Sequence, residues 1–403
     1  MEIIGIIASL LGIIAFFAVA PKDVAKNFKR WFVVPFSLLK QRKVKLSIQE
    51  LFAALNVEDI RIENIFTTNP LKSDCFDSEV VDFNGKLHDE IESIKIKEIK
   101  EKRVLASKNG MTFDNNASFA LRRIDVSRPE GENGKRKNIY KLILEPTDYY
   151  SFVFPNLCLD KRYYNEHTQE HHLLRESLSL YKERLSISTL IDHPNTQFKI
   201  GTGTLAVTSD RYLICSVRSR NQFVATKQDS NELSIHLSTA EGMYRSVNNK
   251  LSSDCFQDGK PSPFITSLRS LKDELNLDEE HLTINDISCF GYFLDLKRSQ
   301  PFFLFFTKLR MAIDEFFSIY SNTSMDIHEN EAIFALPIEF SSIKKLFNNS
   351  RMAELEAMYP EAYNDFFQIN GTSKIRIASN HAKVGFATFI FREFSPLSVS
   401  DFK

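Results

Sequence analysis

The sequence has few cysteines, one tryptophan and almost no net charge. Its five cysteines (Cys75, Cys158, Cys215, Cys255 and Cys289) are widely scattered and never form a C-x-x-C pair. This spacing argues against a disulfide framework and against a zinc site, and it fits a reducing compartment. With 51 Lys and Arg against 52 Asp and Glu, the formal charge is -1. Such a balance gives no broad positive field for duplex nucleic acid, so any charge-driven binding must be local.

What the chain has in abundance is phenylalanine, with 35 residues in a total of 403. Buried aromatic side chains carry large apolar areas, so this composition predicts well-filled sheet cores rather than disorder. A chain of this length has room for one or two soluble domains.

The N-terminal segment from Ile3 to Ala20 has no charged side chain. As a helix it would be about 27 Å long, close to the hydrocarbon thickness of a bilayer, and it predicts a transmembrane helix over residues 1–21. The alternative is a cleaved signal peptide, because Ala18-Val19-Ala20 resembles a cleavage site. The lack of a basic region before the apolar run, and Pro21 just after that site, oppose it.

Positive residues follow this segment and predict that the bulk of the chain is cytoplasmic. They are Lys22, Lys26, Lys29, Arg30, Lys40, Arg42, Lys43 and Lys45. Residues 22–45 are interpreted as a juxtamembrane segment in which 31–39 lies at the headgroups or, equally, forms a strand that packs on the soluble part.

Residues 46–165 are interpreted as an accessory α+β region. The patterns predict a helix over 47–56, a strand or exposed helix over 91–105, strands over 119–129 and 138–146 around Asn133-Gly134, a strand over 148–156, and then a helix from His171. His167, His171 and His172 lack an acidic or cysteine partner that would complete a metal-binding pattern, so they receive no role.

The segment 198–220 predicts two strands joined by a turn at Ser209-Asp210. Residues 266–277 then predict an amphipathic helix whose leucines form one buried face. Its polar face carries Arg269, Asp273 and Glu274. Strands are expected at 287–296 and 301–309, then a strand and a helix within 332–347, and a late strand or helix over 381–394.

The stretch Arg269–Leu277 resembles the second half of the Nudix signature, Arg-Glu-U-x-Glu-Glu-x-Gly-U, where U is bulky and apolar. Arg269 matches the arginine, Leu271 and Leu277 match apolar positions, and Asp273 and Glu274 match the paired acids. The resemblance implies a Nudix-like mixed sheet with flanking helices over residues 166–403. It also implies that the helix carboxylates bind Mg²⁺, which is the catalytic ion of Nudix hydrolases.

The chain departs from that signature at four places. Ser270 replaces the first glutamate, Asp273 is one methylene shorter than the glutamate it matches, and Asn276 replaces the terminal glycine. Residues 248–262 look like an insertion where the first half should lie. A shortened ligand and a lost ligand weaken a Mg²⁺ site, so catalysis is in doubt. Mg²⁺ is therefore possible but no cofactor is required, and Asp273 and Glu274 remain the candidate metal ligands.

The predicted membrane helix, the accessory region and the eroded Nudix helix together resemble membrane-anchored Nudix-like effectors of bacterial cyclic-oligonucleotide anti-phage signalling. The resemblance implies a sensor at the bacterial inner membrane that binds a cyclic nucleotide, forms homo-oligomers and acts on membrane lipids, without binding duplex nucleic acid. Phosphate would be bound by Arg211, Arg218, Arg220 or Arg269.

Two other functions stay open. The chain could be a membrane-tethered, Mg²⁺-dependent hydrolase of a nucleoside diphosphate derivative, in which Asp273 and Glu274 bind the metal and Arg269 orients them. It could also be a scaffold without a small ligand.

Overall fold

The fold is described from a computed structural model of the chain, covering residues 46–108, 113–129, 137–165, 168–218, 232–246, 253–323, 330–347 and 374–397. Contacts divide the chain into two compact units. One comprises residues 1–47 with 395–403, and the other is Ile48–Phe394. Of the first unit, only short pieces are described, in which the backbone N–H of Leu46 donates to the carbonyl of Leu397 (3.0 Å).

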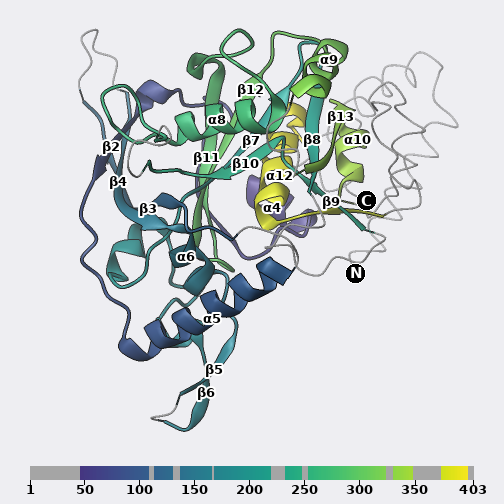
Figure 1. The fold of residues 1–403 in the computed structure, drawn as a ribbon. Helices are drawn as coiled ribbons and strands as arrows, with labels where there is room; N and C mark the ends of the chain where they lie inside the picture. Colours follow the sequence, from purple (N-terminus) through teal and green to yellow (C-terminus); the bar gives the residue numbers. More distant parts are fainter. Residues whose placement is uncertain are drawn as a thin grey trace, which may run out of the picture. The chain divides into compact units, whose positions relative to one another are not determined.

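The second unit is built around a large mixed sheet, which has nine strands in the described part of the chain (Figure 1). Its strands run in the order β1-β11-β12-β7-β8-β9-β14, while β10 pairs with β7 and β13 pairs with β8. The pairs β12–β7 and β14–β9 are parallel, and the other pairs are antiparallel. The strands are β1 (Ile60–Ile65), β7 (Gly201–Val207), β8 (Tyr212–Arg218), β9 (Glu232–His236), β10 (Thr239–Gly242), β11 (Ile287–Asp295), β12 (Gln300–Lys308), β13 (Asn330–Pro337) and β14 (Lys374–Ile377).

Strand β12 shows why this sheet is covered on both faces. Successive side chains of a strand point to opposite faces. Phe305 contacts Phe264 of helix α8 (Pro263–Leu275), with ring centroids 4.8 Å apart, whereas Phe306 stacks on Phe389 of helix α12 (Asn380–Phe394) at 6.1 Å. The sheet therefore lies between α8 and α12. Each fully buried phenylalanine contributes about 1.5–3 kcal/mol.

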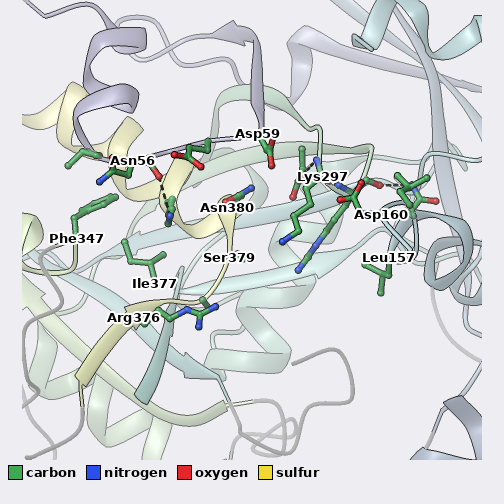
Figure 2. A pocket seen from close by; sticks show the side chains of 18 of the residues that line it. Asn56, Asp59, Leu157, Asp160, Lys297, Phe347, Arg376, Ile377, Ser379 and Asn380 are labelled. Carbon is green, nitrogen blue, oxygen red and sulfur yellow. Dashed lines mark hydrogen bonds between the residues drawn. The ribbon is translucent and has the colours of Figure 1, made fainter. Parts of the chain in front are cut away.

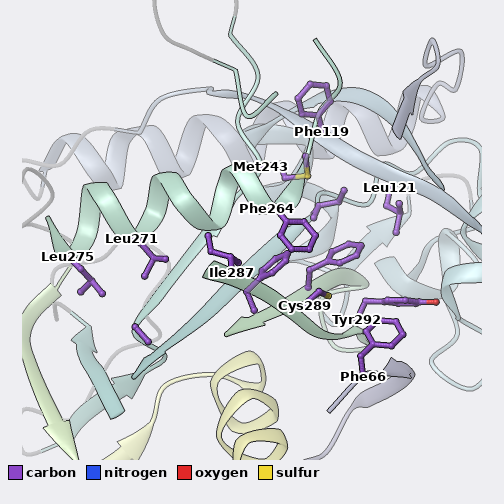
Figure 3. Close-up of a cluster of buried hydrophobic side chains, with 14 of the residues drawn as sticks. Phe66, Phe119, Leu121, Met243, Phe264, Leu271, Leu275, Ile287, Cys289 and Tyr292 are labelled. Carbon is purple, nitrogen blue, oxygen red and sulfur yellow. The ribbon is translucent and has the colours of Figure 1, made fainter. Parts of the chain in front are cut away.

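The larger core lies on the α8 side of the sheet. Leu271 and Leu275 of α8 pack with Ile287 and Cys289 of β11, and Met243 and Phe66 extend the same cluster (Figure 3). Leu271 and Leu275 lie one helical turn apart, so the apolar face that the sequence predicted for this helix is the face that is buried. All five cysteines are free thiols.

Smaller elements surround the large sheet. A second sheet has the order β2-β4-β3, and β5 pairs with β6 in a two-stranded ribbon. The bounds are α4 (Ile48–Ala54), β2 (Phe76–Val80), α5 (Asp89–Lys108), β3 (Ala117–Ser127), β4 (Ile139–Asp148), α6 (Tyr149–Ser151), β5 (Arg162–Asn165), β6 (Glu170–Leu173), α7 (Leu174–Ser177), α9 (Ile313–Thr323) and α10 (Phe340–Lys345), with short turns of helix η2 (Ser73–Cys75), η3 (Phe152–Asn156), η4 (Ile187–Asp192) and η5 (Ile284–Asp286).

The predicted fold class included one transmembrane helix, and this part of the prediction is corrected. In the part of the chain that the structure describes, no helix is both long enough and apolar enough to cross a bilayer. The longest described helix, α5, has 20 residues, but charged side chains run along its whole length. Residues 1–45, which contain the predicted helix and the juxtamembrane segment, lie outside the described residues. The architecture that is seen is mixed α/β with a large sheet.

Most predicted elements are confirmed, including α4, α8, the β3–β4 and β11–β12 pairs and the strands β7 and β8. Two predictions are wrong. The strand expected over 148–156 is a helical turn, because the Asp148 carboxylate accepts a hydrogen bond from Ser151 N–H (2.7 Å) and caps it. The helix expected from His171 is instead β6 followed by the four-residue α7, since residues 170–173 pair with β5. The open alternatives at 91–105 and 381–394 are both resolved as helix.

Candidate functional site

Helix α8 carries the polar residues that resemble the Nudix signature. It begins at the Ser262 N-cap, whose hydroxyl accepts from Phe264 N–H (3.3 Å), and Pro263 takes the first turn. It ends at Asn276, which adopts a left-handed conformation with φ 57°. Asparagine tolerates this conformation better than other side chains, so it can end the helix where the signature has glycine.

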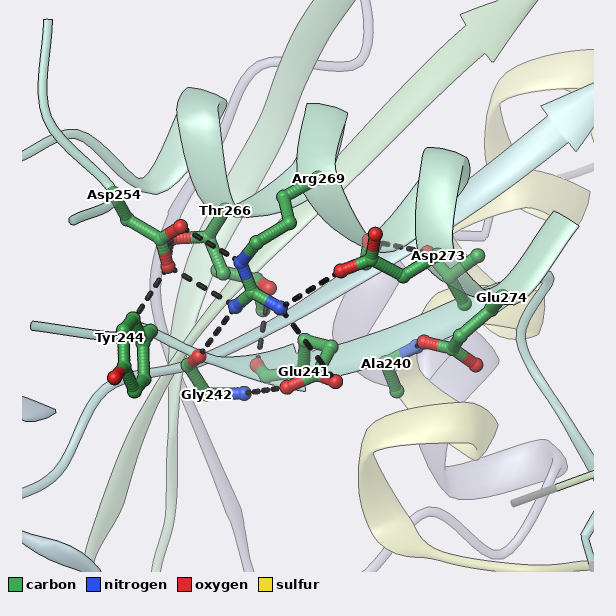
Figure 4. Close-up of polar contacts among 12 residues, drawn as sticks. Ala240, Glu241, Gly242, Tyr244, Asp254, Thr266, Arg269, Asp273 and Glu274 are labelled. Atoms are coloured by element: carbon green, nitrogen blue, oxygen red, sulfur yellow. Dashed lines mark hydrogen bonds and ion pairs between the residues drawn. The ribbon is translucent and has the colours of Figure 1, made fainter. Parts of the chain in front are cut away.

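Arg269 is the centre of an ion-pair network (Figure 4). Its Nε donates to Asp254 Oδ1 (2.8 Å), and its Nη2 donates to Asp254 Oδ2 (3.1 Å) and to the Gly242 carbonyl (3.2 Å). Its Nη1 lies 3.8 Å from Glu241 and 3.5 Å from Asp273. Burial alone lowers the pKa of Arg269, but these carboxylates raise it above its ordinary value. The guanidinium is therefore engaged on all three nitrogens by groups of the protein itself, and its role as a phosphate ligand stays a prediction.

Asp254 was missed by the sequence reasoning, which read residues 248–262 as an insertion. Its side chain is only 1% exposed and also accepts hydrogen bonds from Tyr244 N–H (2.7 Å) and the Thr266 hydroxyl (2.9 Å). The loop that looked like an insertion therefore supplies the acid that fixes Arg269. No spacing rule pointed to it, because the partner lies outside the helix.

The candidate metal ligands on α8 also have protein partners. Glu274 is buried, and its Oε1 accepts a hydrogen bond from the backbone N–H of Ala240 in β10 (3.1 Å). Asp273 lies 3.5 Å from Nη1 of Arg269. Ser270 is 1% exposed and bonds Thr239 (2.8 Å) and the Ser267 carbonyl (2.9 Å), so a glutamate would not fit there.

This donor set does not fit a Mg²⁺ ion, because a cationic guanidinium lies against one carboxylate and a backbone N–H occupies the other. Within the described ranges, no three His, Cys, Asp or Glu side chains come together to hold a metal ion.

Lys199 lies next to this network and was not singled out from the sequence. Its ammonium group is 5.0 Å from the ring centroid of Tyr149 and 5.7 Å from that of Phe152. Burial lowers the pKa of Lys199 to about 8, Glu241 opposes this shift, and Arg269 adds to it. The α6–η3 segment thus packs two aromatic rings against the Lys199 ammonium group.

The three other predicted phosphate ligands are not brought together with Arg269 in the described structure. Arg211 is exposed in the β7–β8 turn, where it lies 3.8 Å from Glu393 of α12. Arg218 ends β8, and nothing is described of its side chain. Arg220 lies outside the described residues.

A large pocket lies elsewhere, beside the N-terminus of α12 (Figure 2). Its volume is about 870 Å³, within the range of small-molecule sites. The walls come from the end of α4, the segment after η3, the β11–β12 turn, and the β14–α12 connection. The charged lining residues are Lys102, Lys161, Lys297, Arg298, Arg376 and Lys383 against Glu58, Asp59, Asp160 and Asp295.

Two of the four acids in this pocket pair with cations that do not line it: Asp59 with Lys182 (2.8 Å) and Asp160 with Arg175 (2.9 Å). Asp295 lies 3.3 Å from His381, a histidine whose pKa is lowered by burial. Of the six cations in the lining, Lys161 pairs with Glu98 outside it (2.8 Å). Lys297 and Arg298 have no side-chain hydrogen bond or ion pair within the described ranges. The pocket is therefore electropositive, although the chain as a whole is not.

The β11–β12 turn that carries Lys297 and Arg298 is held rigidly. Asp295 Oδ1 accepts from the backbone N–H groups of Lys297 (2.9 Å) and Arg298 (3.2 Å). Asn156 Nδ2 donates to the Arg298 carbonyl (2.9 Å), and buried Arg175 donates to the Lys297 carbonyl (2.7 Å). Burial alone raises the pKa of Asp295, but His381 and these backbone donors lower it below its ordinary value.

The sequence did not indicate this pocket, because its six cations come from five separated segments. The nearest signal was the helix pattern over 381–394, which was left open between helix and strand. Known proteins offer no further guide, since no family model matches the chain and no curated protein matches it significantly.

Proposed function

We propose that this chain is a binding protein for a phosphate-bearing, nucleotide-type ligand, which occupies the pocket beside α12. The observation that carries the proposal is the electropositive pocket of about 870 Å³ in a chain whose net charge is -1. A localised concentration of Lys and Arg on fixed backbone is the arrangement expected for a bound anion.

The pocket offers separate partners for phosphate and for a base. Figure 2 shows Lys297 and Arg376 reaching into it from different sides. The N-terminus of α12 also reaches the pocket through Ser379, Asn380 and Lys383, and the dipole of a helix favours negative charge at this end. Phe347, Ile377 and Leu157 supply apolar surface against which a base can pack.

Retained hydrolysis at α8 is the less favoured function. Arg269, Asp273 and Glu274 are committed to each other, to Asp254 and to the β10 backbone, so the signature residues stabilise the fold. We therefore expect ligand binding to be independent of Mg²⁺ and of these carboxylates.

Calorimetric titration of the full-length chain tests the proposal, with ATP, ADP-ribose, a cyclic dinucleotide and inorganic phosphate as probes. Arg298→Gln and Arg376→Gln should each weaken binding of the best probe about tenfold, since a hydrogen bond to a charged group is worth about 1.5–3 kcal/mol. Lys272→Gln, an exposed lysine on α8 outside the pocket, is the matched control and should bind normally.

Two results would overturn the proposal. One is unchanged affinity in both pocket variants, or no binding of any probe. The other is Mg²⁺-dependent turnover of ADP-ribose that disappears in Glu274→Gln, which would restore the hydrolase.

A further inference from the structure

Helix α5 has one face packed on the protein and one face that nothing covers within the described ranges. Its 20 residues give a length of about 30 Å. Ile91, Ile99 and Ala106 are buried on the inner face, from which Lys102 also lines the ligand pocket. On the outside, Ile96 is 63%, Val104 49% and Leu105 53% exposed, which is unusual for large aliphatic side chains on one helix.

The outer face forms a shallow groove lined by Lys97, Lys100, Glu101, Val104, Leu105 and Lys108. At about 100° per residue, Glu90, Lys97, Glu101 and Lys108 fall on a single stripe of this face. Lys97, Glu101 and Lys108 make no ion pair or hydrogen bond within the described part of the chain. Charge and apolar surface are therefore both presented outward.

The charge of α5 reverses along its length. Its first turn carries Asp89, Glu90 and Glu92, whereas its second half carries Lys100, Lys102, Arg103 and Lys108 against the single acid Glu101. A second copy of the helix laid antiparallel would oppose acidic and basic halves twice, once on each side of a two-fold axis. This is self-complementarity, the property that an isologous interface requires.

We propose that a second copy of this chain docks antiparallel on the outer face of α5, about a two-fold axis that crosses this face midway between Lys97 and Glu101. In that register Lys97 of each copy lies opposite Glu101 of the other, and Glu90 lies opposite Lys108. Leu105 then covers Ile94 of the other copy, and Val104 covers Ser93. Because each pair occurs twice about the two-fold axis, the two copies of α5 form two aliphatic contacts and four ion pairs.

An anionic membrane surface fits this face less well. Glu90 and Glu101 lie on the same stripe as the lysines, so they would be repelled by anionic headgroups, whereas both find lysine partners in a second copy. The proposal does not depend on the ligand pocket.

Charge reversal in the full-length chain tests the register, with sedimentation velocity as the readout. Lys97→Glu alone, and Glu101→Lys alone, each place like charges opposite one another twice. Each should raise the dimer dissociation constant roughly tenfold or more. An equimolar mixture of these two variants restores both attractive pairs, so it should dimerise as the unaltered chain does, and so should the double variant.

Lys272→Glu on α8 is the matched control, because it makes the same charge change outside this face, and it should leave the dissociation constant unchanged. Recovery in the mixture also shows that both single variants are folded. The proposal fails if the unaltered chain is monomeric, if the single variants dimerise normally, or if mixing them restores nothing.

Discussion

The polar cluster on α8 and the pocket beside α12 are both rich in charged residues, yet their charges are used in opposite ways. On α8, Arg269 contacts three carboxylates and a carbonyl, so its positive charge is compensated by groups of the protein itself. In the pocket, two of the four acids are paired with cations outside the lining, and Lys297 and Arg298 are held in place by their backbones rather than by ion pairs.

A residue can match a catalytic signature and still be unavailable to a ligand. A residue pattern that matches a catalytic signature identifies side chains of the right type, but catalysis and binding need side chains whose bonding capacity is not already satisfied. By that criterion we expect α8 to be a structural element and the pocket to be the place where a ligand gains interactions.

The largest expected effect is on α8. Asp254→Asn removes the buried carboxylate that makes two hydrogen bonds with Arg269, which leaves the guanidinium with incomplete compensation. Breaking a buried pair by removing one partner typically destabilises by about 3–5 kcal/mol. We expect a loss of that size in chemical denaturation of the full-length chain. Ligand affinity of the folded fraction should stay unchanged.

Lys272→Gln serves as the comparison for Asp254→Asn, because Lys272 is exposed on the same helix. Its effect should be within about 0.5 kcal/mol, as is usual for surface substitutions. An equally small effect of Asp254→Asn would mean that the α8 cluster is not structural.

The sequence predicted local elements well wherever one periodicity dominated. The leucines of α8 recur at helical spacing and are buried on one face, and the continuous apolar run of β12 is buried on both faces of the sheet. The prediction failed at 148–156, where the Asp148 side chain caps a helical turn in place of the expected strand. It also failed at 171–186, where pairing of β6 with β5 outweighs helix propensity. These competing contacts are too specific to be read from composition.

The candidate site was less predictable than the fold. Arg269, Asp273 and Glu274 were found because they share a helix, but Asp254 reaches Arg269 from a loop. The pocket unites Asn56, Lys161, Arg298 and Arg376 only through tertiary structure, so no spacing in the sequence indicates it. The proposed domain boundary at residue 165 stays a prediction, and residues 48–394 form one compact unit.

A smaller effect is expected at Lys199. Its pKa is lowered to about 8 in the folded chain, against an ordinary value of 10.5. The unfolded chain therefore binds more protons between these values, and folding stability should rise as the pH rises from about 8 to 10.5. After allowance for partial exposure, we expect about 1–2 kcal/mol.

Lys199→Met should abolish that rise in stability, which pH-dependent urea denaturation can measure. The aromatic contacts with Tyr149 and Phe152 suit methionine, so the fold should be retained. A rise of the same size in the variant would assign the pH dependence to another group.

The smallest expected change in stability is in the pocket. Arg376 and Lys297 are exposed, and Lys297 has no side-chain partner within the described ranges. Replacing either by glutamine should change the unfolding free energy by less than about 0.5 kcal/mol, because exposed charged groups contribute little to stability. Removing positive charge from an electropositive pocket can even stabilise the free protein slightly. If the same variants lose ligand affinity, then charge in this pocket serves the ligand, just as charge on α8 serves the fold. A stability loss comparable to that of Asp254→Asn would erase the distinction between the two regions.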